Sequence, residues 1–135
     1  MSAAEYTDDD TILREVELYR RIPPEWLVRD QNLGIVRPSS QAFQDSRDGT
    51  PMSVALSDVL LAAGREPGSV LAGLEGFALA SITAGLAREC RQGIQRDPIQ
   101  EEPAHAFVFG KKTSGVKSRF AKECRWVIQP ENTNR

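Results

Sequence analysis

The chain has 135 residues, of which 40% are hydrophobic and 27% charged, and its formal net charge is −2. This length fits one domain, which can bury roughly two-thirds of the surface of its unfolded chain. A total charge near zero argues against a protein that binds nucleic acid over its whole surface. The two cysteines stand in no metal-ligand spacing, so we expect no disulfide scaffold, no zinc or other metal site and no bound cofactor.

The sequence favours a location in the cytoplasm. Its N-terminus reads MSAAEYTDDD, which lacks the basic and apolar regions of a secretory signal. The longest weakly polar window, residues 69–87, is interrupted by Glu75 and several small residues, so it is a poor membrane span. We therefore expect no membrane partner.

We expect three regions along the chain. Residues 1–10 contain four acidic residues and no basic one, which is typical of an acidic flexible N-terminal tail. Residues 11–130 are predicted to form a single globular domain, and residues 131–135 a C-terminal tail.

The N-terminal half predicts mainly short strands. Residues 11–22 (TILREVELYRRI) fit a helical stripe and strand alternation equally, so both alternatives stay open. Residues 26–38 predict two strands joined by a turn at 31–34. Residues 38–51 read as a long polar loop. A strand over 52–56 (MSVAL) is followed by a short helix that ends at Gly64.

The C-terminal half alternates strands and helices. Residues 77–82 predict a strand, and Thr83 is placed to cap a helix over 84–92, although one longer helix from Leu71 is an alternative. A polar connection over 95–103 leads to a strand over 105–109, and Ser114 is predicted to cap a last helix over 115–127. The sequence thus indicates an α+β fold, a small single domain with a short mixed or antiparallel sheet and two or three packed helices.

Positive charge gathers near the C-terminus, where a strand ends in Gly110 and leads through KKTS into the last helix. Such a turn presents backbone N–H groups that accept phosphate or carboxylate, and Trp126 is predicted beside the exposed cations, where a base can stack. The alternative is a solvated surface with Trp126 in the core. The candidate anion-binding residues are Lys111, Lys112, Thr113, Ser114, Lys117, Arg119 and Lys122. The stretch is not a P-loop, because His105 stands where that motif needs glycine.

Two further polar features are candidate sites. His105, the one histidine, suits a general acid or base, or else a structural hydrogen bond. The cluster Arg37, Ser39 and Ser40 suits a phosphate or carboxylate, or else the cap of a short turn. The candidate catalytic residues are His105, Arg37 and Arg20, provided that they converge on one cleft.

Residues 18–58 resemble the start of ADP-ribosyltransferase-like toxins of the RES type. The resemblance rests on LYRRIPP, the polar loop that follows and TPMSVALSD. It implies a dinucleotide pocket in which Arg20 or Arg21 binds the nicotinamide dinucleotide and Ser40 lies in the second motif. The candidates for the catalytic glutamate of that family are Glu75 and Glu102.

Three functions are therefore considered. The leading hypothesis is a small bacterial-type interaction or accessory protein that binds a polyanion, either nucleic acid or a nucleotide- or phosphate-bearing partner, through the basic strand-turn-helix. The second is a small enzyme acting on a phosphate-containing substrate with His105, Arg37 and an arginine of residues 19–21. The third is a structural subunit of a protein complex that contacts its partner through residues 67–87 or through the acidic N-terminal tail.

Overall fold

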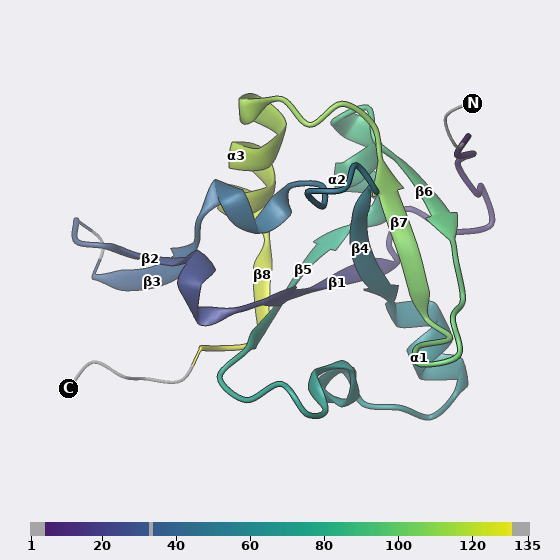
Figure 1. The fold of residues 1–135 in the computed structure, drawn as a ribbon, viewed down its shortest axis with the longest axis horizontal. Helices are drawn as coiled ribbons and strands as arrows, with labels where there is room; N and C mark the ends of the chain where they lie inside the picture. The colour runs from purple at the N-terminus through teal and green to yellow at the C-terminus, as the bar shows by residue number, and fades with distance from the viewer. Residues whose placement is uncertain (1–4, 33, 131–135) are drawn as a thin grey trace.

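The computed structural model describes residues 5–32 and 34–130, and within them the chain forms two antiparallel sheets. The large sheet contains β1 (Glu17–Ile22), β4 (Met52–Leu56), β5 (Ala78–Thr83), β6 (Gly93–Arg96), β7 (His105–Phe109) and β8 (Arg125–Ile128). Its strand order is β6-β7-β4-β1-β5-β8 (Figure 1). The small sheet is the predicted hairpin of β2 (Leu27–Asp30) and β3 (Ile35–Pro38). The α+β class is confirmed.

Three short α-helices accompany the sheets in the part of the chain that the structure describes: α1 (Ser57–Ala62), α2 (Ala84–Glu89) and α3 (Ser114–Glu123). As predicted, Thr83 caps α2, because its hydroxyl accepts a hydrogen bond from the Leu86 N–H at 3.0 Å. Single 3₁₀ turns lie at Pro24–Trp26, Ser40–Phe43 and Pro67–Leu71. None of the described helices is long and apolar enough to cross a membrane.

The side chains of the large sheet alternate between two apolar clusters, as strand geometry requires. The main cluster contains Leu18 of β1 and Val54 of β4, and its aromatic centre is an edge-to-face contact between Phe43 and Phe120 of α3, with ring centroids 6.0 Å apart. The second cluster lies on the opposite face. It contains Tyr19, Ala55, Leu60, Val70, Leu79 and Ala104.

The structure decides one open alternative and corrects two predicted elements. Residues 17–22 form a strand rather than a helix, because β1 lies inside the sheet and pairs with both β4 and β5. The predicted polar connection over 95–103 begins within β6, which pairs with β7. The last helix ends at Glu123, and the chain continues as β8, which pairs with β5. In each case the pairing of strands that are distant in the sequence decides the structure, and the local sequence pattern does not.

Part of the acidic N-terminal segment contacts the large sheet. The described residues 5–10 pack along the outer side of β6: the Asp8 carboxylate accepts from the Ile94 N–H at 2.8 Å, and the Asp9 N–H donates to the Ile94 carbonyl at 2.8 Å. Tyr6 stacks on Phe109 with centroids 5.6 Å apart. The segment thereby covers an edge strand whose backbone groups would otherwise lack partners. Residues 1–4 and 131–135 lie outside the described residues.

Gly93 begins β6 because the ring of Phe109 occupies the place of a side chain. A Cβ added at this position would overlap the Phe109 ring, whereas a Cβ at Gly115 of α3 would have no neighbour closer than 3.8 Å. We expect Gly93→Ala to lower the free energy of unfolding by about 1–3 kcal/mol through overpacking. The matched change Gly115→Ala should leave it unchanged or raise it by up to about 1 kcal/mol. Urea denaturation measures both, and equal effects would contradict the packing explanation.

Candidate functional site

The predicted anion-binding turn serves mainly as the start of α3. Thr113, not Ser114, caps the helix: its hydroxyl accepts a hydrogen bond from the Val116 N–H at 3.2 Å. Ser114 is the first residue of the helix. Thr113 is therefore the cap that the sequence assigned to Ser114.

Lys112 is buried and paired. Its ammonium group lies 2.7 Å from the Asp45 carboxylate and donates to the Val108 carbonyl at 2.7 Å, and its side chain is 4% exposed. Burial lowers the pKa of Lys112, and the nearby Asp45 opposes that effect. Lys112 ties the polar loop to β7, so it is not accessible to a large polyanion.

Arg119 is neutralised by two acids. Its guanidinium lies 2.7 Å from the carboxylate of Glu89 and 2.7 Å from that of Glu123. The last helix is also shorter than predicted, because Trp126 lies on β8. Of the predicted anion-binding lysines, the exposed residues Lys111 and Lys122 and the partly buried Lys117 remain.

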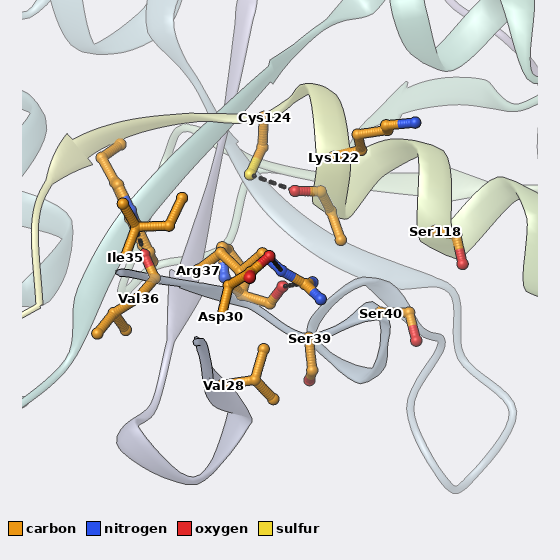
Figure 2. A pocket seen from close by; sticks show the side chains of 13 residues that line it. Val28, Asp30, Ile35, Val36, Arg37, Ser39, Ser40, Ser118, Lys122 and Cys124 are labelled. Atoms are coloured by element: carbon orange, nitrogen blue, oxygen red, sulfur yellow. Dashed lines mark hydrogen bonds and ion pairs between the residues drawn. The ribbon is translucent and has the colours of Figure 1, made fainter. Parts of the chain in front are cut away.

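A groove of about 710 Å³ lies between the β2–β3 hairpin and α3 (Figure 2), and we call it the hairpin groove. It joins the cluster of Arg37, Ser39 and Ser40 with residues of the C-terminal region. Its lining consists of Val28, Asp30, Ile35, Val36, Arg37, Pro38, Ser39, Ser40, Ser118, Ala121, Lys122, Cys124 and Trp126. Two features that lie about 80 residues apart in the sequence thus share one concavity.

The charged centre of the hairpin groove is Arg37. Figure 2 shows its guanidinium between the hairpin and α3, where its Nε lies 3.6 Å from a carboxylate oxygen of Asp30. Arg37 also donates a long hydrogen bond of 3.4 Å to the Pro38 carbonyl, and its side chain is 44% exposed. Arg37 is consequently accessible to an anion, and Lys122 adds a second positive charge to the lining.

The walls of the groove are apolar. The Trp126 indole donates from Nε1 to the Val36 carbonyl at 3.3 Å, which fixes its ring against the hairpin. Val28 and Ile35 of the hairpin remain 37% and 48% exposed. The Ser39 hydroxyl is buried, with no hydrogen-bond partner among the described residues, a state that is unusual for a buried polar group. The groove can therefore hold an apolar or aromatic group beside an anion.

A second, smaller pocket of about 190 Å³ lies where β1 and β4 separate, and we call it the strand pocket. The two strands pair only at Leu18 with Leu56 and at Tyr19 with Ala55. The strand pocket is lined by Tyr19, Arg20, Arg21, Ser53, Val54, Ala55, Val70, Ile99, Glu101, Glu102 and His105. His105 and Arg20 thus line one pocket and Arg37 the other, so the three candidate catalytic residues do not converge on one cleft.

Arg20 has a structural environment. Its Nε donates to the Ala42 carbonyl at 2.8 Å and its Nη1 to the Ser53 carbonyl at 2.9 Å. The guanidinium also lies 5.4 Å from the ring centroid of Trp26. Burial lowers the pKa of Arg20 to about 10. These contacts occupy the group that the enzyme hypothesis assigns to a substrate.

Comparisons with protein-family models, with curated protein sequences and with solved structures gave no match for this chain. The residues implied by the resemblance to RES-type toxins also separate: Arg21 and Glu102 line the strand pocket, whereas Ser40 lines the hairpin groove and Glu75 lines neither. Glu102 is held by Arg65 through two hydrogen bonds of 2.6 and 2.9 Å. Among the residues that the structure describes, no cluster of three or more His, Cys, Asp or Glu could hold a metal ion.

Sequence reasoning missed several residues that the structure brings to the two pockets. Ser118 lines the hairpin groove and was not among the predicted residues, whereas Trp126, which was predicted on the last helix, lines the groove from β8. Ser53 and Asp97 contact His105 from neighbouring strands. No short-range signal could find them, because the register of β4, β6 and β7 sets these contacts.

The pairing of Glu102 with Arg65 predicts an acid-sensitive contribution to stability. Hydrogen bonds from Arg65 lower the pKa of Glu102 below its usual 4.5. A carboxylate whose pKa is lower in the folded than in the unfolded protein stabilises the fold. This stabilisation is complete above the pKa of the unfolded protein and is lost as the pH falls through the pKa of the folded protein. The destabilisation caused by Glu102→Gln, measured by urea unfolding, should therefore be largest at neutral pH and shrink below about pH 4.5. A cost that is independent of pH would contradict this role.

The burial of Lys112 predicts a structural role that Lys111 does not share. Lys112→Met keeps most of the side-chain volume but removes the ammonium group that pairs with Asp45 and donates to the Val108 carbonyl. We expect it to lower the free energy of unfolding by about 1–3 kcal/mol. The exposed neighbour provides the control, since Lys111→Met should change stability by less than about 0.5 kcal/mol. Thermal or urea unfolding of the two variants measures the difference, and equal stabilities would be inconsistent with the buried ion pair.

Proposed function

We propose that the protein binds a phosphate-bearing ligand of nucleotide size in the hairpin groove. The observation that carries the proposal is the convergence of Arg37 and its neighbouring serines with Lys122, Ser118 and Trp126 around one concavity of about 710 Å³. A groove of this size lies within the range of small-ligand pockets. The ligand class is that of the leading sequence hypothesis, and the binding surface is the groove rather than the basic turn.

The chemistry of the lining supports a nucleotide. Arg37 and Lys122 supply the positive charge for a phosphate, and the Ser40 and Ser118 hydroxyls at the same groove can donate hydrogen bonds to its oxygens. The Trp126 ring and the side chains of Val28 and Ile35 offer an apolar surface to a base. Asp30 limits the net charge of the groove, which favours a ligand with few phosphates over a long polyanion.

The small net charge of the groove also weighs against extended duplex binding. Lys112 and Arg119 are paired with acids, so a continuous basic face comparable to that of duplex-binding proteins does not extend over the described part of α3. A short single-stranded end that carries a 5′ phosphate fits the same lining as a free nucleotide, because both offer one base next to one phosphate.

Calorimetric titration with AMP, ADP and inorganic pyrophosphate tests the proposal. We expect AMP and ADP to bind more tightly than pyrophosphate, because the base contributes apolar contact. Arg37→Gln and Lys122→Gln should each weaken the nucleotide by roughly ten- to a hundredfold, since each removes a charge-assisted hydrogen bond. Lys111→Gln is the matched control, because Lys111 is exposed and does not line the groove, and it should leave the affinity unchanged.

Fluorescence separates the groove from the rest of the surface. Trp126 lines the groove and Trp26 does not, so a nucleotide-dependent change of emission should persist in Trp26→Phe and disappear in Trp126→Phe. Absence of binding by all three probes at millimolar concentration would overturn the proposal, as would equal affinities of the wild type and the Arg37→Gln and Lys122→Gln variants.

A further inference from the structure

A serine and a histidine on two neighbouring strands meet an aspartate at the end of a third. Ser53 lies on β4, His105 is the first residue of β7, and Asp97 directly follows β6. His105 Nε2 lies 3.0 Å from the Ser53 hydroxyl, and His105 Nδ1 lies 3.0 Å from a carboxylate oxygen of Asp97. The sheet register produces this row, because β7 pairs with β4 on one side and with β6 on the other.

The contacts of the imidazole determine which nitrogen carries the proton. Among the described residues, the partners of Nδ1 are two acceptors, the carboxylate of Asp97 and the Asp97 backbone carbonyl, each at 3.0 Å. The neutral ring therefore carries its hydrogen on Nδ1, and Nε2 accepts the hydrogen of the Ser53 hydroxyl. This is the arrangement in which a histidine base activates a serine nucleophile and an acid fixes the tautomer.

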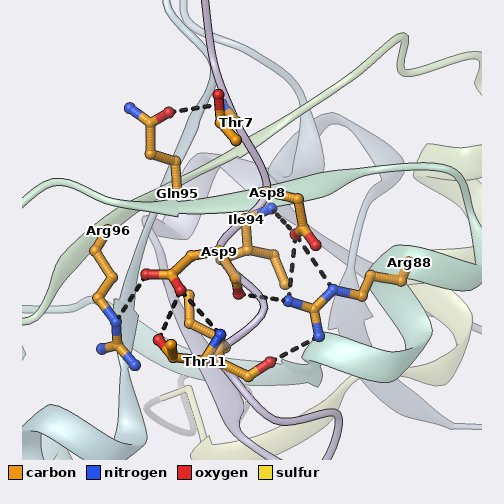
Figure 3. Close-up of polar contacts among 9 residues, drawn as sticks. Thr7, Asp8, Asp9, Thr11, Arg88, Ile94, Gln95 and Arg96 are labelled. Atoms are coloured by element: carbon orange, nitrogen blue, oxygen red, sulfur yellow. Dashed lines mark hydrogen bonds and ion pairs between the residues drawn. The ribbon is translucent and has the colours of Figure 1, made fainter.

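The surroundings hold the row in place and leave it accessible. Phe107 packs edge-on against the His105 ring, with centroids 5.0 Å apart, and Tyr6 packs against Phe107 at 5.7 Å. The end of β6 is anchored by Arg96, which pairs with Asp9 at 3.2 Å (Figure 3). The His105 side chain is nevertheless 16% exposed and lines the strand pocket.

The strand pocket also contains a positive group for a developing negative charge. Arg21 lines the pocket beside Ser53 and His105, and its Nε donates to the Val70 carbonyl at 2.8 Å. Its two terminal nitrogens have no hydrogen-bond partner among the described residues, and its charge helps to lower the pKa of Glu102 in the same pocket. A guanidinium in this position can stabilise the oxygen of a carbonyl under attack, and it can also orient an acidic substrate.

From this geometry we infer that the strand pocket is a second, independent site with a serine-hydrolase activity toward small carboxylic esters. The Ser53 oxygen bonds to the ester carbonyl carbon while its proton passes to His105 Nε2. The bond between that carbon and the alcohol oxygen then breaks, and the leaving alcohol takes the proton from Nε2. Water repeats the sequence on the acyl-serine: its proton passes to Nε2, the carboxylic acid leaves and Ser53 regains its hydrogen. Asp97 stabilises the transient imidazolium.

The volume of about 190 Å³ sets the substrate class. It is smaller than the pockets that hold drug-sized ligands, so we expect an acyl group of only a few carbons. Acetate esters should consequently react faster than octanoate esters of the same alcohol.

Covalent labelling of the wild-type protein is the deciding experiment. We expect a fluorophosphonate probe to modify Ser53, as located by peptide mass spectrometry, and to block hydrolysis of p-nitrophenyl acetate. His105→Gln should slow the labelling by roughly a hundredfold or more, because the base is lost while the fold keeps an amide in its place. Asp97→Asn should also slow the labelling, because the carboxylate that fixes the tautomer and stabilises the imidazolium is lost. Arg21→Gln should lower the turnover of the ester.

A matched control separates reactivity from simple exposure. Ser46 is exposed and lies in the polar loop away from the strand pocket, so Ser46→Ala should label like the wild type. A wild-type protein that reacts at several serines at equal rates, or that carries no label on Ser53 at high probe concentration, would overturn the inference. Ester hydrolysis that survives unchanged in Ser53→Ala and His105→Gln would do the same.

Discussion

The arrangement of both pockets depends on how Arg20 satisfies the backbone next to β1. Its guanidinium bonds to the carbonyls of Ser53 and Ala42, so β4 can leave β1 after two paired residues without leaving the Ser53 carbonyl unsatisfied. The separation of these strands opens the strand pocket. The same side chain also anchors the 3₁₀ turn at Ser40–Phe43. This turn follows the segment that contains Arg37 of the hairpin groove. The charged Arg20 side chain can be buried here because its hydrogen bonds replace those that it would make to water.

The positively charged residues near the C-terminus differ in whether an acidic partner holds them. Lys112 and Arg119 hold elements together through Asp45, Glu89 and Glu123, whereas Lys122 lies at the rim of the hairpin groove. Lysine and arginine side chains look equivalent in a list of charges, but a buried ammonium needs a partner and an exposed one does not. The proposed ligand site is accordingly smaller than the basic region of the sequence.

The two pockets use different faces of the large sheet. Ala55 and Tyr19 at the strand pocket belong to the second apolar cluster, whereas α3, which forms a wall of the hairpin groove, packs on the first through Phe120. A ligand in the groove and a substrate in the strand pocket would therefore not compete for space. Because successive side chains along β4 and β7 point to opposite faces, one sheet can carry both pockets.

The sequence by itself determined the local features. It indicated the α+β class, the hairpin, the strands that begin at Met52 and His105 and the cap at Thr83, because alternation, turn residues and capping chemistry act over a few neighbours. Only the tertiary structure decided that β1 is a strand, that β8 replaces the end of the last helix, and that Ser53 and Asp97 meet His105. Those outcomes depend on pairing between segments that lie tens of residues apart, and a side chain's burial or ion-pair partner is fixed only when that pairing forms.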